Sequence, residues 1–264
     1  MIIHVLHLGL VPYGTALQLQ RTLMELRKQG RIENTLLLLE HPPVITLGRN
    51  ARLSNVIASP EFLAQRGVEL FEIDRGGDVT FHGPGQLVAY PIFDLRSFDP
   101  KIGAVEFVRR LEEVLIRTCG DFGIGAQRIK GLTGVWTCAP PNKPEAKIAA
   151  IGVHISRGVT THGFALNVST DLDFFSLIVP CGITGKPVTS MHRELQKTLT
   201  MEQVATAASR NFGRVFRSQM LWLESLDDLI GEAALAPQAP ANQDVPARPP
   251  AELRELHGEG NELA

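Results

Sequence analysis

Two long stretches with strand character follow each other almost directly in the second half of the chain. Residues 147–155 read KIAAIGVHI and residues 159–168 read VTTHGFALNV, both rich in apolar and β-branched residues. Only Ser156, Arg157 and Gly158 separate them, and a short link that contains glycine is typical of a tight hairpin turn. Parallel strands would need a crossover of about a dozen residues or more. The spacing therefore predicts an antiparallel pair of long strands.

Further elements define the fold class. Strand-like runs are expected at residues 2–8, 35–39, 68–73, 79–82 and 86–95. Helices are expected at residues 12–29, at residues 102–122 and from Thr200 onward, where apolar residues recur at helical spacing. Thr200 and Gln203 have the spacing of a capping box. Strands that follow one another, with helices between only some of them, predict an α+β fold with a mixed, mostly antiparallel sheet flanked by helices.

The composition changes near the C-terminal end. Residues 232–264 are rich in Pro, Ala and polar residues, and such a segment buries too little apolar surface to offset its ordering entropy. The 264-residue chain is long enough to bury a sizeable core. We therefore expect one catalytic domain in residues 1–231 and a disordered tail in residues 232–264.

Composition and charge exclude several classes of protein. Hydrophobic residues make up 44% and charged residues 20%, with a net charge of −2, so neither nucleic acid nor an anionic membrane is expected as a partner. No run approaches the ~20 apolar residues of a membrane span, and the short apolar N-terminal run is expected to be a strand rather than a signal peptide. The three cysteines, Cys119, Cys138 and Cys181, form neither a disulfide framework nor a CxxC zinc motif. A reducing cytoplasm is therefore the expected location.

A glycine-rich segment, RGGDVTFHGPGQ, occupies residues 75–86 between two expected strands. Glycines at this density let a ligand approach the backbone closely, and Arg75 and His82 add polar groups. The segment is neither a Walker A motif nor a dinucleotide-binding fingerprint, because no Gly-Lys-Ser/Thr follows and the glycines do not open a helix. The spacing alone leaves a ligand-binding loop and an ordinary hairpin turn with a structural histidine equally open.

Cys181 and Lys147 are candidate reactive groups, and each also has an interpretation as an inert residue. Cys181 stands between Pro180 and Gly182 after an apolar run, which favours a defined turn, although most free cysteines are buried and inert. Lys147 begins an otherwise apolar strand, where desolvation would lower its pKa and let it accept a proton. Its alternative is a lysine whose ammonium reaches solvent at a strand end.

Three histidines raise the question of a metal site. His154 and His162 flank the expected hairpin turn, and His82 could join them. No carboxylate or cysteine is spaced to complete a ligand set. We therefore expect no metal.

These segments together resemble one family, the lipoyl(octanoyl) transferases, also called octanoyl-[acyl-carrier-protein]–protein N-octanoyltransferases. The sequence RGGDVTFHGPGQLVAYPIFDL at residues 75–95 is similar to the family signature. KIAAIGVHISRGVTTHGFALNV at residues 147–168 and the run ending PCGI at Ile183 resemble the next two family blocks, and EHPPVITLGRN at residues 40–50 resembles another. The resemblance covers roughly residues 1–220, and blocks in the family order are a specific signal.

The resemblance implies a catalytic dyad of Cys181 and Lys147 on a fold shared with biotin and lipoate protein ligases. It implies an acyl-binding pocket formed by Arg75, Gly76, Gly77, Asp78, Val79, Thr80, Phe81, His82, Ala150, Ile151, Gly152, Gly163, Phe164 and Ala165. The chain departs from the family pattern in a Pro-rich insertion at residues 139–146 and in its long tail. Neither departure touches the dyad.

The implied activity is transfer of octanoyl from octanoyl-acyl carrier protein to a lysine of lipoyl domains, through a thioester on Cys181. This is the first step of endogenous protein lipoylation, with the 2-oxoacid dehydrogenase complexes and the glycine cleavage H protein as acceptors. No bound cofactor is implied, because the donor carries its own phosphopantetheine, and the family favours a monomer. Both protein partners are typically acidic, so a basic rim is expected around the site. Its candidates are Arg49, Arg52, Arg75, Lys130 and Arg157.

Three other functions stay open. An ATP-dependent lipoate or biotin ligase would stabilise an acyl-adenylate with a lysine and would not need Cys181. A module that binds carrier protein without catalysis would have no use for an activated thiol. A thioesterase would form the same acyl-enzyme and pass the acyl group to water.

Overall fold

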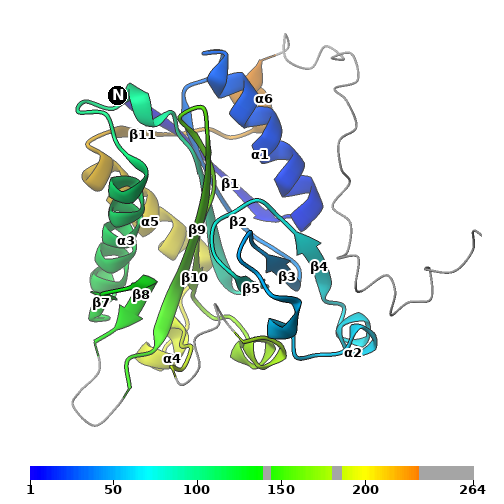
Figure 1. Cartoon of the computed structure of the whole chain (residues 1–264). Coiled ribbons are helices and arrows are strands. Elements are labelled where there is room, and N and C mark those ends of the chain that lie inside the picture. The colour runs from blue at the N-terminus through cyan, green and yellow to red at the C-terminus, as the bar shows by residue number, and fades with distance from the viewer. Residues whose placement is uncertain (139–143, 180–185, 232–264) are drawn as a thin grey trace, which may run out of the picture.

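The computed structural model describes residues 1–138, 144–179 and 186–231 (Figure 1). Its strands are β1 (Ile2–Leu10), β2 (Asn34–Glu40), β3 (Val44–Leu47), β4 (Glu69–Glu72), β5 (Val79–His82), β6 (Gln86–Ile92), β7 (Ala126–Ile129), β8 (Leu132–Thr137), β9 (Lys147–Ser156), β10 (Val159–Asn167) and β11 (Gln219–Trp222). Its α-helices are α1 (Tyr13–Lys28), α2 (Pro60–Gln65), α3 (Ala104–Asp121), α4 (Met191–Leu195), α5 (Met201–Phe216) and α6 (Leu226–Ile230). Short 3-10 helices occur at Leu53–Asn55, Leu95–Ser97 and Leu172–Leu177.

The strands form one large and one small sheet. The large sheet has eight strands in the order β11-β1-β2-β6-β10-β9-β8-β7. Strand β1 pairs in parallel with both of its neighbours, and the other adjacent pairs are antiparallel. The small sheet has the order β4-β3-β5. The prediction of an α+β fold with a mixed, mostly antiparallel sheet and flanking helices is confirmed.

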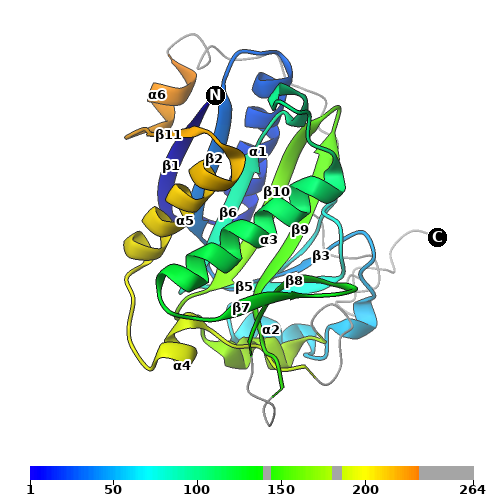
Figure 2. The same ribbon diagram turned by 90° about the vertical axis from the view of Figure 1, so that its left-hand side faces the viewer.

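Strand β2 shows that the large sheet is covered on both faces. Its leucines at residues 36–39 are all fully buried, and successive side chains of a strand point to opposite faces. Leu36 and Leu38 belong to the core that also contains the inner faces of α3 and α5. Leu37 and Leu39 belong to the core formed with α1. Figure 2 shows α3 and α5 over one face of the sheet, and in Figure 1 α1 and the small sheet lie on the other side.

The predicted hairpin is β9 and β10. Strand β9 ends at Ser156 and β10 begins at Val159, so two residues form the turn. Arg157 has a φ of 51° and Gly158 a φ of 86°. Two successive left-handed residues are typical of a type I′ turn, whose twist matches that of the strands it joins.

The predicted helices agree with the structure apart from their ends. Thr200 accepts a hydrogen bond from the backbone of Gln203 and the Gln203 side chain accepts one from Thr200, so the capping box is confirmed. Pro12 precedes α1 as its N-cap. The strand expected at residues 86–95 ends earlier, because the side chain of Asp94 caps a 3-10 helix. The expected tail at 232–264 lies outside the described residues, so the domain boundary stays a prediction.

Strand β5 separates two environments. Val79 and Phe81 pack in a small apolar core with Leu63 and Leu177, whereas Thr80 and His82 line a cavity on the opposite side. This alternation follows from the two-residue period of a strand. In the three described stretches of chain, no helix combines the length and apolar character that crossing a membrane requires.

Candidate active site

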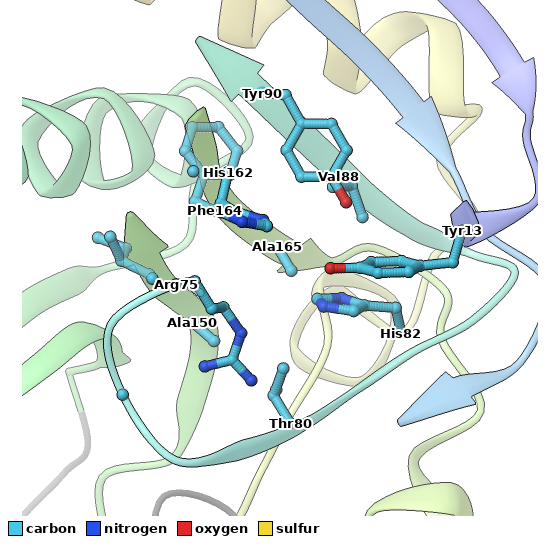
Figure 3. A pocket seen from close by; sticks show the side chains of 14 residues that line it. Tyr13, Arg75, Thr80, His82, Val88, Tyr90, Ala150, His162, Phe164 and Ala165 are labelled. Atoms are coloured by element: carbon cyan, nitrogen blue, oxygen red, sulfur yellow. The ribbon is translucent and has the colours of Figure 1, made fainter. Parts of the chain in front are cut away.

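A cavity lies between the large sheet, the small sheet and the start of α1 (Figure 3). Strand β6 contributes Val88 and Tyr90 to its wall, and β5 contributes Thr80 and His82. The full lining consists of Tyr13, Arg75, Gly77, Thr80, His82, Val88, Tyr90, Ala150, Ile151, Gly152, His162, Gly163, Phe164 and Ala165. The wall along β9 and β10 is therefore mostly apolar, with His162 as its polar side chain, and the wall is polar where Tyr13, the β5 residues and Tyr90 meet.

The structure brings most of the expected pocket residues to this cavity. Arg75, Gly77, Thr80 and His82 line it from the glycine-rich segment, and Ala150, Ile151, Gly152, Gly163, Phe164 and Ala165 line it from the β9–β10 hairpin. Their role in binding stays a prediction.

Four of the expected residues lie elsewhere. Val79 and Phe81 face the small apolar core. Asp78 accepts hydrogen bonds from the Asn55 side chain and from its neighbour's backbone. Gly76 donates its N–H to the carbonyl of Val153 at 3.0 Å. These residues shape the loop around the cavity rather than its surface.

The cavity also contains residues that the sequence analysis did not assign to the pocket. Tyr13, Val88 and Tyr90 line it, and the alternation of Val88 and Tyr90 along β6 is the signal that would have found two of them. The sequence marks His162 only as a candidate metal ligand. Tyr13 lines the cavity because the start of α1 packs against strands that are distant in the chain, and the sequence holds no local signal for such packing.

Arg75 lies inside the cavity wall and is 7% exposed. Its Nη2 donates to the carbonyl of Thr46 at 2.8 Å and to Oγ1 of Thr46 at 2.9 Å. Its Nη1 donates to the carbonyl of Gly76 at 3.1 Å. The expectation that Arg75 belongs to a basic rim is therefore wrong, because these hydrogen bonds direct its guanidinium toward the protein interior.

The other candidates for that rim are exposed and separated along the fold. Arg49 and Arg52 follow β3, Lys130 lies in the β7–β8 connection and Arg157 in the β9–β10 turn. The basic rim as a docking surface stays a prediction.

The buried residue His41 is hydrogen-bonded to Tyr90, which lines the cavity. Nδ1 of His41 lies 2.7 Å from the carbonyl of Val11, so Nδ1 must carry the proton and donate. Nε2 of His41 then accepts from the hydroxyl of Tyr90 at 2.7 Å. Burial lowers the pKa of His41 to about 4 and raises that of Tyr90. Both groups are therefore neutral at pH 7.

A second chain of hydrogen bonds begins at His82. Its Nδ1 lies 2.7 Å from Oε1 of Gln86, whose Nε2 donates to Oδ1 of Asn167 at 2.9 Å. Nδ2 of Asn167 donates to the carbonyl of Thr189 at 2.9 Å. Burial, with a smaller contribution from His41, lowers the pKa of His82 to about 3. The imidazole is therefore neutral.

An acidic residue ties the glycine-rich segment to the hairpin. Oδ1 of Asp74 lies 2.9 Å from Nε2 of His162, and Oδ2 lies 3.5 Å from Nε2 of His154. Arg49 contacts Nδ1 of His154 at 3.1 Å. The hydrogen bond from His162 is the main cause that lowers the pKa of Asp74 to about 2. Among the residues with described positions, no group of His, Cys, Asp and Glu could hold a metal ion.

Lys147 is the first residue of β9 and is 8% exposed. Its Nζ lies 5.4 Å from the centre of the Trp136 ring, within the range of a cation–π contact. Its backbone N–H donates to the carbonyl of Pro187 at 2.8 Å, and its carbonyl accepts from the N–H of Thr189 at 2.9 Å. Lys147 is thus joined to the segment that follows residues 180–185.

Cys181 lies outside the described residues, as does most of the Pro-rich insertion, at residues 139–143. The described residues that flank the segment with Cys181 are held by the protein. Val179 donates its N–H to the carbonyl of Asn55 at 2.7 Å. Nζ of Lys186 lies 2.8 Å from a carboxylate oxygen of Glu145 and 5.5 Å from the Trp136 ring centre. Of the other cysteines, Cys119 is buried and Cys138 is exposed, and burial raises the pKa of Cys119 to about 12.

Comparison with known proteins places the chain in a family. Residues 12–213 match the lipoyl protein ligase A/B catalytic domain. An octanoyltransferase of Koribacter versatilis is 66% identical over 97% of this chain and 97% of its own length. An octanoyltransferase of Acidobacterium capsulatum is 61% identical over 90% of this chain and 100% of its own length.

Solved structures agree on the fold. A bipartite lipoate protein ligase from Thermoplasma acidophilum superposes with a TM-score of 0.65 at 18% identity, over 85% of this chain and 87% of that chain. A lipoate-protein ligase A bound with ATP has the same TM-score and identity, over 85% of this chain and 89% of that chain. The protein is thus an acyltransferase by its relatives, and the chain belongs to the octanoyltransferases of the lipoyl protein ligase A/B catalytic domain family.

Proposed function

We propose that the chain transfers octanoyl from octanoyl-acyl carrier protein to a lysine of lipoyl domains, through a thioester on Cys181. Relatives named octanoyltransferases, which match nearly the whole chain, support the acyl group. The observation that carries the chemistry is the position of Lys147. It is a nearly buried lysine at the start of the strand that lines the cavity, and it is bonded through its backbone to Pro187 and Thr189, which follow Cys181 closely in the chain.

The first half-reaction loads the enzyme. Lys147 accepts the proton of the Cys181 thiol, and the resulting ammonium stabilises the thiolate through its charge. The sulfur attacks the octanoyl carbonyl carbon, so a new carbon–sulfur bond forms and the bond to the phosphopantetheine sulfur breaks. The leaving sulfur takes the proton back from Lys147.

The second half-reaction discharges the enzyme. The neutral amine of the acceptor lysine attacks the thioester carbonyl carbon, and the bond from that carbon to the sulfur of Cys181 breaks. Lys147 accepts the proton that the amine nitrogen loses. A thioester becomes an amide, which is downhill, so neither ATP nor a bound cofactor is required.

The apolar part of the cavity wall is suited to binding an aliphatic acyl group. Ala150 and Ala165 face each other in register on β9 and β10, and Val88 and Phe164 add apolar surface. Burial contributes ~0.8 kcal/mol for each methylene. Burial of eight carbons therefore contributes several kcal/mol to the binding free energy. A cavity of fixed depth excludes longer chains and binds shorter chains more weakly, so it selects for chain length.

The same proposal extends to the partners. The acceptors are lipoyl domains of 2-oxoacid dehydrogenase complexes and the glycine cleavage H protein, and the donor is acyl carrier protein. We propose that the enzyme acts as a monomer in a reducing cytoplasm, where Cys181 stays a free thiol.

Intact-protein mass spectrometry tests the proposal. Wild type and Cys181→Ser are mixed with octanoyl-acyl carrier protein without ATP. An octanoyl adduct on wild type that hydroxylamine removes, that is absent from the variant, and that apo lipoyl domain discharges is the expected result. Modification of the lipoyl domain only with ATP and free fatty acid would instead identify a ligase, and discharge to water at the same rate without a lipoyl domain would identify a thioesterase.

A further inference from the structure

The side chain of Tyr13 lines the cavity and ends in a hydroxyl. Its ring contacts the rings of His41 and Phe71, with centroids 5.0 and 5.1 Å away. Figure 3 shows the hydroxyl at the end of the ring that points into the cavity. Among the described residues, none forms a hydrogen bond with this hydroxyl. Burial raises the pKa of Tyr13, so the hydroxyl keeps its proton and can donate it.

His82 has a second unpartnered group on the cavity wall. Nδ2 of Asn167 faces the carbonyl of Thr189, which can only accept, so Oδ1 of Asn167 accepts from Nε2 of Gln86. Oε1 of Gln86 is thus left to face Nδ1 of His82 at 2.7 Å, and Nδ1 must carry the proton. Because burial keeps this imidazole neutral, its Nε2 has a lone pair and no proton. Within the part of the chain that the structure describes, nothing donates to Nε2.

These two groups face the same space. The rings of Tyr13 and His82 stack with an interplanar angle of 8° and with their centroids 6.2 Å apart. Tyr13 is 1% exposed and His82 is 8% exposed, so the protein shields both from bulk solvent. Figure 3 shows the imidazole beside the hydroxyl end of the Tyr13 ring. A hydrogen-bond donor and a lone pair thus lie next to each other in the cavity, and we call them the Tyr13–His82 pair.

An unsubstituted alkyl chain does not match this pair. It fits the apolar part of the wall, which consists mainly of Val88, Ala150, Ile151, Phe164 and Ala165, but it offers no hydrogen bond. The matching group accepts from the Tyr13 hydroxyl and donates to Nε2 of His82, and an alcohol does both with one oxygen. A carboxylate can only accept and an ammonium can only donate, and burial of either charge is unfavourable.

We propose that the cavity also takes a medium-chain acyl group that carries a hydroxyl, whose O–H donates to Nε2 of His82 and whose oxygen accepts from the hydroxyl of Tyr13. The inference rests on the proposed function and extends it to a second class of donor, acyl carrier protein loaded with a hydroxyacyl group. The bond changes are those of octanoyl transfer, in which the thioester bond breaks and an amide bond forms. The hydroxyl of the chain forms no covalent bond and loses no proton.

A set of acyl donors tests this inference on the wild-type chain. Octanoyl-acyl carrier protein competes in one sample with each octanoyl isomer that is hydroxylated at one carbon from C3 to C8, and mass spectrometry of the lipoyl domain counts both products. We expect one isomer, or two neighbouring ones, to be transferred within about threefold of octanoyl, because that hydroxyl is paired. The other isomers should be transferred at least about tenfold more slowly, since their hydroxyls face the apolar wall. A tenfold deficit for every isomer, or equal transfer of all of them, would overturn the inference.

Two variants that each lose one hydroxyl test where the chain is recognised. Tyr13→Phe keeps the ring, and for the preferred isomer the ratio of its transfer to that of octanoyl is expected to fall about fivefold, the size of one lost hydrogen bond. Thr80→Val is the matched control, because Thr80 also lines the cavity, two residues before His82 on the same face of β5. Its ratio should stay within about twofold of wild type. No fall in Tyr13→Phe, or an equal fall in both variants, contradicts the Tyr13–His82 pair as the hydroxyl site.

Octanoyl transfer in the same samples separates this inference from the proposed function. If octanoyl itself reaches no lipoyl domain from its carrier, both fall. If octanoyl is transferred and no hydroxylated isomer comes within tenfold of it, only the hydroxyl site falls. Thermal unfolding identifies a variant that does not fold, and the wild-type series decides the question without it.

Discussion

Gly134 leaves the space in which the side chain of Lys147 lies. A Cβ at Gly134 would be 2.8 Å from Cε of Lys147 and 2.7 Å from the carbonyl oxygen of Ala149. The φ of Gly134 is +120°, a conformation that L-residues rarely adopt. Strand β8 thus approaches the start of β9 closely enough to hold the lysine in place, and only glycine permits it.

Gly134→Ala is therefore expected to displace Lys147 and slow octanoyl transfer by about tenfold to a hundredfold, since small misplacements of a reacting group are costly. The measurement is the rate of lipoyl-domain modification at saturating octanoyl-acyl carrier protein. Gly131→Ala is the matched control, because Gly131 also has a positive φ, +82°, but open space around it. It should lose about 1 kcal/mol of stability and keep its activity. Equal activities of the two variants would show that Gly134 does not position the lysine.

Lys147→Met should remove the proposed base and slow loading of Cys181 by about a hundredfold or more, the usual contribution of a general base. Lys186→Met is its control. Lys186 lies at a similar distance from the Trp136 ring, 5.5 Å, but pairs with Glu145 and is more exposed. Rapid-quench mass spectrometry of the acyl-enzyme compares the loading rates of the two variants. A larger fall in the loading rate of Lys186→Met would mean that Lys147 is not the base.

Ala165→Leu is expected to shorten the cavity and shift selection toward shorter chains. Ala165 lines the cavity opposite Ala150 and is 4% exposed, so a larger side chain there would fill part of the space that we propose for the acyl chain. Exclusion of two methylenes removes ~1.6 kcal/mol at ~0.8 kcal/mol each, or about a tenfold fall in the octanoyl-to-hexanoyl ratio. Competition between the two acyl carrier proteins measures that ratio within one sample, which cancels any general loss of activity. An unchanged ratio would place the end of the acyl chain away from Ala165.

The buried histidines predict a loss of stability in mild acid. The pKa values of His41 and His82 are lowered to about 4 and about 3 in the folded protein, from about 6.5 in the unfolded chain. Between these values the unfolded state binds more protons, so the free energy of unfolding falls as the pH decreases below about 6.5, by up to ~1.4 kcal/mol per pH unit for each group.

Urea unfolding at pH 7.5 and pH 5 measures this loss. His41→Gln, which cannot be protonated, should show a smaller difference between the two pH values than wild type. The stability contributed by Asp74, whose pKa is lowered to about 2, is separate, because it is present above pH ~4 and lost only below it. An identical pH dependence in wild type and His41→Gln would mean that His41 is already protonated in the folded protein at pH 5.

The sequence predicted those parts of the fold whose signals are local. The β9–β10 hairpin, the capping box at Thr200 and the buried run of β2 follow from turn geometry, side-chain capping and hydrophobicity along a few residues. Strands β3, β7, β8 and β11 were missed, because these runs of four to six residues gain their stability from the strands that they pair with.

The candidate site shows the same limit. The glycine-rich segment is recognisable in the sequence as a unit. Which of its side chains face the cavity depends on the alternation of side chains along β5, where Thr80 and His82 face the cavity and Val79 and Phe81 face the small apolar core. Tyr13 and Gln86 have no pattern that marks them. Their positions depend on how α1 and β6 pack against the rest, which is a tertiary property. The proposal that Cys181 is the nucleophile rests on the resemblance to the family motif, and Cys181 lies outside the described residues.

The division of the cavity wall between two sheets has a consequence for how an acyl chain gains access. The wall on β6 and β10 belongs to strands buried on both faces, so opening them would expose two cores at once. The wall on β5 belongs to a three-stranded sheet with its own small core. In hydrogen exchange, amides of β6 and β10 should therefore report global unfolding, whereas those of β5 should exchange through smaller, more frequent openings. The β6 and β10 side of the cavity is therefore expected to stay fixed while the β5 side opens.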